Sequence, residues 1–226
     1  THVHTATKTH PSVIVTAAHV LYSRIDGQKF KDCSYRPDNK RLSGIPFAEI
    51  DRHRYQPLSN NHLGQSETDV VFVSLKYPLY APNMSLSAQG SPKDKLFLVA
   101  YNSTMDAMHL SENCAQFSSV RFASDQLILH NCDAQAGASG GALLDPSHTK
   151  VIAVHGGTFV VRSQTVGDGS NALNVEPAGS RANPESWINH ARKVDQSMIN
   201  QLRYFVAYLA KDSSGQTRSH GQSPEY

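Results

Sequence analysis

The sequence has no long apolar run, no strong excess of one charge and few cysteines, and each absence excludes a class of protein. No segment approaches the roughly 20 consecutive apolar residues that a membrane-spanning helix needs. Lysine plus arginine number 21 and aspartate plus glutamate 19, so the net charge is only +2. This balance argues against nucleic acid or an anionic membrane as a partner. A signal peptide and a start methionine are also lacking, so we expect a processed or trimmed chain.

The 226 residues are enough for one sizeable domain or two small ones with a real apolar core. Short β-branched and apolar runs recur between turn residues, and no helical pattern separates them. This arrangement is typical of an antiparallel barrel or sandwich. The runs are Ser12–Thr16, Asp69–Leu75, Lys95–Ala100, Leu127–Leu129, Ala142–Leu144, Val151–Val154 and Phe159–Val161.

One helix is predicted near the C-terminal end, over residues 183–210. Asn183, Pro184 and Glu185 form a typical helix start, with a capping residue, a proline in the first turn and an acid. Residues 211–226 are polar and predict a disordered tail. We expect the helix to pack on the domain through one apolar stripe. The stripe consists of Trp187, Ala191, Val194, Met198, Leu202, Phe205 and Leu209.

A single hydroxyl, on Ser139, lies within the small-residue segment GASGG of residues 137–141. Small residues let a backbone bend tightly and let a substrate carbonyl approach it. A nucleophilic serine needs a base, a carboxylate that orients the base, and N–H groups aimed at an oxyanion. By itself the motif also fits a flexible glycine loop.

Two further polar residues stand at the ends of apolar β-type runs. His19 follows the run that ends in Ala17 and Ala18, and Asp69 precedes the run that begins at Val70. Alone, each has an ordinary structural explanation. Together with Ser139 they supply a base, a carboxylate and a nucleophile in the order His, Asp, Ser.

Three segments resemble signatures of the chymotrypsin-like (trypsin-like) serine peptidases. The resemblance extends over roughly residues 5–200 and is closest in style to bacterial trypsin-like peptidases and glutamyl endopeptidases. Ala138 and Val20 depart from digestive trypsins, which have an aspartate before the nucleophile and a cysteine after the histidine. The segments are VTAAH at 15–19, TDVVFV at 68–73 and GASGGA at 137–142.

The resemblance implies a fold and roles for the site residues. The expected fold is all-β, with two antiparallel barrels over residues 1–88 and 89–182 and the C-terminal helix, and with the family's first strand missing. His19 is implied as general base and acid, Asp69 as its orienting carboxylate and Ser139 as nucleophile. Gly137 and Ser139 are implied as the oxyanion donors. The implied activity is that of a serine endopeptidase without cofactor, acting on peptides or proteins as a secreted or periplasmic monomer.

The side chain that such an enzyme would prefer at the cleaved bond stays open between two residues. Asp133 lies six residues before Ser139, where trypsin-like enzymes place the acid that binds Arg or Lys. His155 lies in the segment 154–157, which is expected to line the pocket and to pair with the substrate backbone. Glutamyl endopeptidases use a histidine in this region for an acidic side chain. The position of Asp133 favours the basic preference. Val154, Gly156 and Gly157 are the other expected substrate-binding residues.

We expect Cys114 and Cys132 to form a disulfide ahead of the nucleophile loop, which leaves Cys33 as the remaining thiol. A bridge over 18 residues would contribute about 3 kcal/mol by the loop-entropy relation. It would also indicate an oxidising compartment.

Three other interpretations each fit part of the sequence. An α/β-hydrolase also places its serine in Gly-x-Ser-x-Gly, but that fold needs the order Ser, acid, His and alternating strands and helices. A pseudopeptidase would keep the fold as a peptide-binding module without turnover. A metal site could involve His2, His4 and His10, but no cysteine or paired carboxylate lies nearby, which favours a solvated tail.

Overall fold

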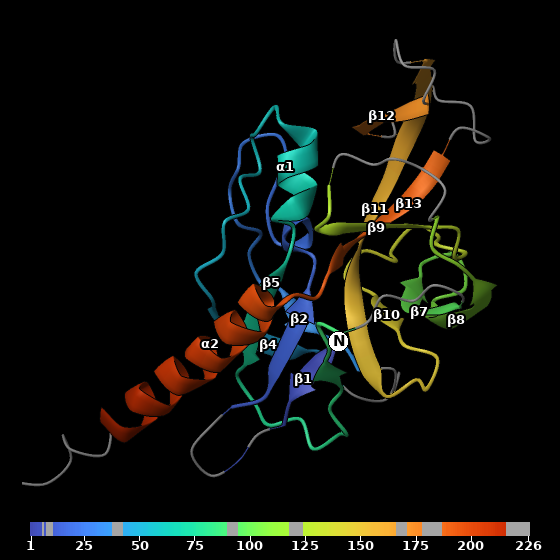
Figure 1. Ribbon diagram of the computed structural model, residues 1–226. Coiled ribbons are helices and arrows are strands. Elements are labelled where there is room, and N and C mark those ends of the chain that lie inside the picture. The colour runs from blue at the N-terminus through green and yellow to red at the C-terminus, as the bar shows by residue number, and fades with distance from the viewer. Residues whose placement is uncertain are drawn as a thin grey trace, which may run out of the picture.

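The computed structural model describes residues 1–5, 7, 11–37, 43–89, 95–117, 124–165, 171–177 and 187–215. Two β-sheets and one long C-terminal helix dominate it (Figure 1). The prediction of an all-β body with a C-terminal helix is therefore confirmed. Short apolar runs separated by turns produce this architecture because the strands pair edge to edge into sheets, whose apolar faces then pack against other elements.

The first sheet has five strands in the order β1-β2-β5-β4-β3. A 3-10 turn, Ala18–Val20, follows β2, and the six-residue helix α1, His62–Glu67, leads into β5. Strands β2 and β5 are apolar and almost completely buried, so they form the centre of the sheet. The strands are β1 His2–His4, β2 Val13–Thr16, β3 Ser34–Tyr35, β4 Ile45–Ile50 and β5 Val71–Leu75.

The second sheet follows the order β8-β7-β10-β11-β13-β9, with β12 and β6 also paired to β11. Its longest strand, β11, spans Lys150–Thr165 and joins two runs that the sequence separates. The other strands are β6 Ser85–Leu86, β7 Leu96–Asn102, β8 Ala107–Cys114, β9 Leu127–His130, β10 Ala142–Leu144, β12 Asn171–Pro177 and β13 Trp187–Lys193.

Helix α2, Gln196–Gly215, follows the second sheet in sequence but lies beside the first sheet (Figure 1). Its Gln201 side chain donates to the buried carboxylate of Asp51, which comes directly after β4. One apolar cluster joins both sheets to the helix, in addition to separate clusters within the first and the second sheet. This cluster includes Val15, Phe72, Leu144, Val154, Met198 and Phe205.

The helix begins later than the sequence predicts. Trp187–Lys193 is strand β13, which pairs with β9 and β11, and the expected start at residues 183–185 lies outside the described residues. Asp195 supplies the actual cap, because its Oδ1 accepts the Met198 N–H at 2.8 Å. At the other end, Lys211–Gly215 continue α2, so disorder from residue 211 is wrong for these five residues. Residues 216–226 lie outside the described ranges.

The N-terminal segment is part of the first sheet and is not a solvated tail. Strand β1 pairs antiparallel with β2, where the sequence predicts no preceding strand, and His2 and Val3 are buried. His10 lies outside the described residues. Within the described part of the chain, no group of three or more His, Cys, Asp or Glu side chains is placed to hold a metal ion. Nor does any described helix have the length and apolar character to cross a membrane.

Candidate active site

The pairing of β2 with β5 brings His19 and Asp69 together. The two strands are antiparallel, with Thr16 opposite Val71. His19 comes three residues after the end of β2, and Asp69 comes two residues before the start of β5. The end of one strand and the start of its antiparallel neighbour meet at the same edge of a sheet. A separation of 50 residues in sequence thus becomes direct contact.

His19, Asp69 and Ser139 form one hydrogen-bonded chain. The His19 Nδ1 atom lies 2.6 Å from Asp69 Oδ2, and His19 Nε2 lies 2.9 Å from Ser139 Oγ. Asp69 is 3% exposed, and its Oδ1 accepts the backbone N–H of His19 at 2.8 Å. With Nδ1–H donating to the carboxylate, Nε2 is the atom that accepts the Ser139 hydroxyl proton.

Ser139 lies in the turn between β9 and β10, and two flanking glycines allow its backbone path. Gly137 has φ +94° and Gly140 has φ +81°, which are left-handed values that disfavour side chains. The Gly140 N–H donates to His155 O at 2.8 Å, and the His155 N–H returns a bond to Gly141 O at 2.8 Å. These bonds fix the nucleophile loop to β11.

The backbone N–H groups around Ser139 fall into two sets. The Ala138 and Gly141 amides donate within the loop, to Gln135 O at 3.0 Å and Ala138 O at 2.9 Å. Among the described residues, the amides of Gly137 and Ser139 have no protein acceptor. Two neighbouring unpaired N–H groups beside a serine hydroxyl are the arrangement that stabilises an oxyanion.

Two clefts meet at Ser139. The primary cleft, about 460 Å³, is lined by the segment 132–137, by His155 and by Trp187 and Asn189. The lateral cleft, about 340 Å³, lies on the side of His19 and α1. Ser139, Gly157 and Thr158 line both clefts, so a chain bound along β11 could reach both.

The sequence matches the family model described as the trypsin-like peptidase domain over residues 4–154. The chain belongs to the trypsin-like peptidase family. Solved structures similar to this chain include two that illustrate its fold. One, a Glu endopeptidase in complex with MPD, is 15% identical, with 91% of this chain and 89% of that chain covered and a TM-score of 0.55. The other, a thermostable serine protease AL20 from an extremophilic microorganism, is 12% identical, with 91% and 88% covered and a TM-score of 0.57. No curated protein matches the chain at a significant level.

These similarities confirm the chymotrypsin-like fold that the three motifs predict. The Cys114–Cys132 disulfide is also confirmed, with its Cα atoms 4.6 Å apart, and Cys33 is a free thiol. The bridge joins the end of β8 to the start of the nucleophile loop. In this trypsin-like peptidase, Ala138 is buried beside Ser139, at the place where trypsins hold the aspartate that pairs with a new N-terminus.

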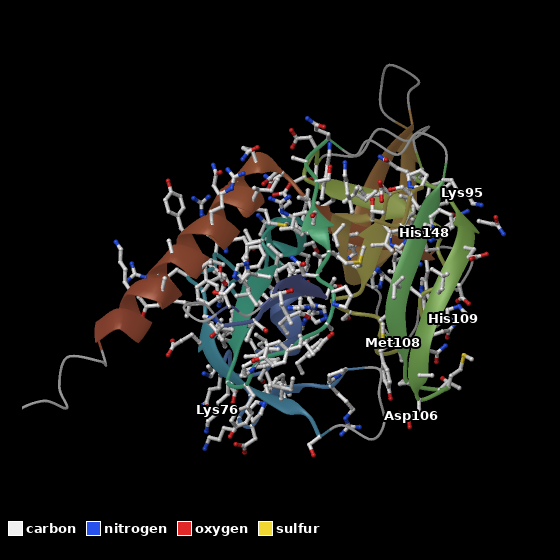
Figure 2. The ribbon with its side chains drawn as sticks, turned by 90° about the horizontal axis from the view of Figure 1, so that it is seen from below. Lys76, Lys95, Asp106, Met108, His109 and His148 are labelled. Atoms are coloured by element: carbon white, nitrogen blue, oxygen red, sulfur yellow. A yellow bond between two sulfur atoms is a disulfide. The ribbon has the colours of Figure 1, made fainter. Side chains whose placement is uncertain are left out.

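Asp133 lies at the rim of the primary cleft. Its side chain is 60% exposed, and its Oδ2 is 3.8 Å from Nε2 of His109. Its Oδ1 accepts from Gln135 Nε2 at 2.8 Å. Figure 2 shows His109 on β8, the outermost strand of the second sheet. The carboxylate therefore already has a hydrogen-bond donor and a nearby imidazole, and it contacts solvent.

His155 belongs to a buried cluster with His130 and His190. These side chains are 3%, 0% and 6% exposed. His130 Nδ1 accepts the Cys132 N–H at 3.3 Å, so its own proton is on Nε2, which lies 3.2 Å from His155 Nδ1. His155 therefore carries its proton on Nε2. Burial, with a smaller contribution from the neighbouring His19, lowers the pKa of His155 to about 4, so the primary cleft contains a neutral N–H donor at neutral pH.

Sequence reasoning missed His130, His190 and Arg192. The two histidines lie on β9 and β13, and neither stands in a recognisable motif. Arg192, which is 7% exposed, donates to Glu67 O at 2.6 Å and to Gln126 O at 3.4 Å. Its other terminal nitrogen lies 2.6 Å from Asp195 Oδ2. It thereby ties the end of α1, two residues before Asp69, to the second sheet.

Proposed function

We propose that this trypsin-like peptidase hydrolyses peptide bonds as a serine endopeptidase, with His19, Asp69 and Ser139 as its catalytic triad. The continuous hydrogen-bonded path from Asp69 through His19 to Ser139 is the observation that carries the proposal. The unpaired amides of Gly137 and Ser139 support it. The disulfide supports a secreted or periplasmic location, since oxidising compartments retain such bonds.

The proposed reaction has two halves. Ser139 Oγ attacks the carbonyl carbon while His19 Nε2 takes the hydroxyl proton, and the Gly137 and Ser139 N–H groups hold the oxyanion. The tetrahedral intermediate that results then collapses and breaks the C–N bond of the peptide. His19 gives its proton to the departing amine. Water then attacks the acyl ester with His19 as base, which releases the acid and restores Ser139.

A serine-directed phosphonate probe tests this activity. We expect covalent labelling of the wild type at Ser139 and none in Ser139→Ala. Labelled protein should lose peptidase activity in proportion to the label. Absence of both labelling and turnover in a folded wild type would favour the alternative, a peptide-binding module without catalysis.

For the side chain at the cleaved bond, we propose an acidic preference through His155, in place of the basic preference through Asp133. A basic side chain binds most strongly to a buried carboxylate that has no other partner. Asp133, by contrast, is exposed and accepts a hydrogen bond from Gln135. The His155 Nε2–H is a buried donor suited to a carboxylate oxygen. The fold is also that of a structure described as a Glu endopeptidase.

Profiling cleavage on a mixed peptide library decides between the two preferences, with Ser139→Ala as the blank. We expect cutting after Glu or Asp. His155→Gln should reduce that selectivity, whereas Asp133→Asn should leave it in place. Cleavage confined to Arg and Lys bonds, and lost in Asp133→Asn, would reverse the assignment.

A further inference from the structure

The lateral cleft has the chemistry of a second recognition site. Its side chains come from the 3-10 turn after β2 and the loop that follows it, from α1 and from the second sheet, and among them Arg24 and His62 are exposed. Two of the other polar groups are already engaged, because Gln65 Nε2 donates to Gln56 O at 2.9 Å and Ser66 Oγ donates to His62 O at 3.0 Å. The cleft is lined by His19, Arg24, His62, Gln65, Ser66 and His190.

The position of this cleft fixes which substrate residue reaches it, given the proposed peptidase function. An extended peptide on β11 would direct successive side chains to opposite faces. The primary and lateral clefts share Ser139, Gly157 and Thr158, but the segment 132–137 lines only the primary cleft, and His19 and α1 line only the lateral one. When one side chain occupies the primary cleft, the side chain immediately before it in the peptide therefore faces the lateral cleft.

The charge of the lateral cleft is positive. Arg24 carries the permanent charge, and among the described residues no Asp or Glu side chain lines the cleft. The carboxylate of Asp69, behind His19, is buried, and both of its oxygens bond to His19. Burial and the neighbouring His155 and His19 lower the pKa of His190, on the inner wall, well below its usual value, and Arg24 contributes least to that shift.

From this geometry we infer that the lateral cleft is a second specificity subsite, in which Arg24 selects peptides with an acidic side chain immediately before the cleaved residue. His62, which lines the same cleft as Arg24, is placed to donate a hydrogen bond to the carboxylate of the acidic substrate residue. The substrate class is thus an acidic peptide segment and not a single acidic residue.

A peptide pair that differs only at this position tests the inference. Both peptides carry the residue favoured in the primary cleft, preceded by Asp in one and by the isosteric Asn in the other. For the wild type at low salt, we expect kcat/KM to be about two- to fivefold higher for the Asp peptide, the size typical of an exposed ion pair. The advantage should shrink as salt screens the pair.

Variants assign the effect to Arg24. We expect Arg24→Gln to bring the Asp/Asn ratio to about one and Arg24→Glu to reverse it, by the same ion-pair magnitude. The matched control is Arg203→Gln, which removes the same charge from an exposed position on α2 and should keep the wild-type ratio.

The outcomes separate this inference from the proposed function. Equal cleavage of the two peptides by the wild type would overturn the subsite and leave the peptidase function intact. A ratio that persists in Arg24→Gln would overturn the role of Arg24. If neither peptide is cut by folded wild-type protein, the proposed function fails and the subsite with it.

Discussion

At the scale of the residue, the site depends on three side chains whose atoms contact one another directly. The His19 ring bonds to a buried carboxylate on one side and to a hydroxyl on the other. Such a ring is held in one orientation and one tautomer. Its neighbour Asp69 keeps both oxygens occupied, so it cannot rotate without losing two hydrogen bonds.

Replacing His19 by Ala should lower kcat by about three orders of magnitude or more, because the serine then has no base. The measurement is steady-state hydrolysis of the best library peptide, with thermal unfolding as a check of the fold. The double variant His19→Ala/Ser139→Ala should be no slower than either single variant, since the residues act as one unit. Near-normal activity of His19→Ala would refute the triad assignment.

The buried histidine cluster predicts a loss of stability in acid. Burial holds the pKa of His155 at about 4, below its ordinary value of 6.5, and lowers those of His130 and His190 as well. The unfolded chain therefore binds protons that the folded chain does not. The free energy of unfolding should fall as the pH drops from about 6.5 toward 4, by up to about 1.4 kcal/mol per pH unit for each histidine.

Urea unfolding at a series of pH values measures this slope. His130→Gln removes one titrating group and keeps an acceptor for the Cys132 N–H, so its stability should depend less steeply on pH. An identical slope in the variant would show that His130 does not contribute.

At the scale of the element, two contacts of the Asp195 side chain mark the boundary between strand β13 and helix α2. Asp195 caps α2 and also pairs with Arg192. The stripe from Trp187 to Leu209 has helical spacing throughout, yet its first part pairs as β13 between β9 and β11. An open position between two strands favours strand pairing over a local helical preference.

Asp195→Ala should lower the free energy of unfolding by about 1 kcal/mol, because the Met198 N–H loses its cap. Asp195→Asn keeps the cap and removes only the charge opposite Arg192, so its loss should be smaller. Chemical denaturation of the two variants beside the wild type makes the comparison. Equal losses would assign the effect to the ion pair and not to the cap.

Arg192→Leu should cost about 2 to 3 kcal/mol of unfolding free energy, since the carbonyls of Glu67, Gln126 and Lys193 lose a charged donor. It should also lower kcat more than it changes KM, because Glu67, which Arg192 anchors, lies two residues before Asp69. Arg203→Leu, on the exposed face of α2, should affect neither quantity. A stability loss with normal kcat would limit Arg192 to a structural role.

At the scale of the whole molecule, one apolar cluster and one disulfide hold the parts together. The cluster reaches from the first sheet through the second to α2, so we expect the described body to unfold as a unit. The disulfide acts locally, between β8 and the nucleophile loop.

Removing the disulfide with Cys114→Ala/Cys132→Ala should lower the unfolding free energy by about 3 kcal/mol. The Cys33→Ala variant, which removes the free thiol, is the control and should change stability little. A thiol count in denaturant without reductant should give one thiol for the wild type, and a count of three would contradict the bridge.

The strands that the sequence predicts are those with strong apolar runs. Strands β2, β5, β7, β9 and β10 are such segments, and burial of both faces explains their composition. Strand β4 is interrupted by a proline and a glutamate, and strand β8, at the sheet edge, by several polar residues, so neither has the continuous apolar run that marks the other strands. Their strand state comes from pairing with β5 and β7.

The sequence by itself determined the family, the fold class, the disulfide and the three residues of the candidate triad, because local motifs around His19, Asp69 and Ser139 encode the backbone that each side chain needs. Only the tertiary structure decided what surrounds them. Asp133 lies at an exposed rim, His155 rests on His130, and Arg24 faces the lateral cleft. These features depend on contacts between residues far apart in sequence. A local sequence pattern does not predict how deeply such residues are buried or which charges lie near them.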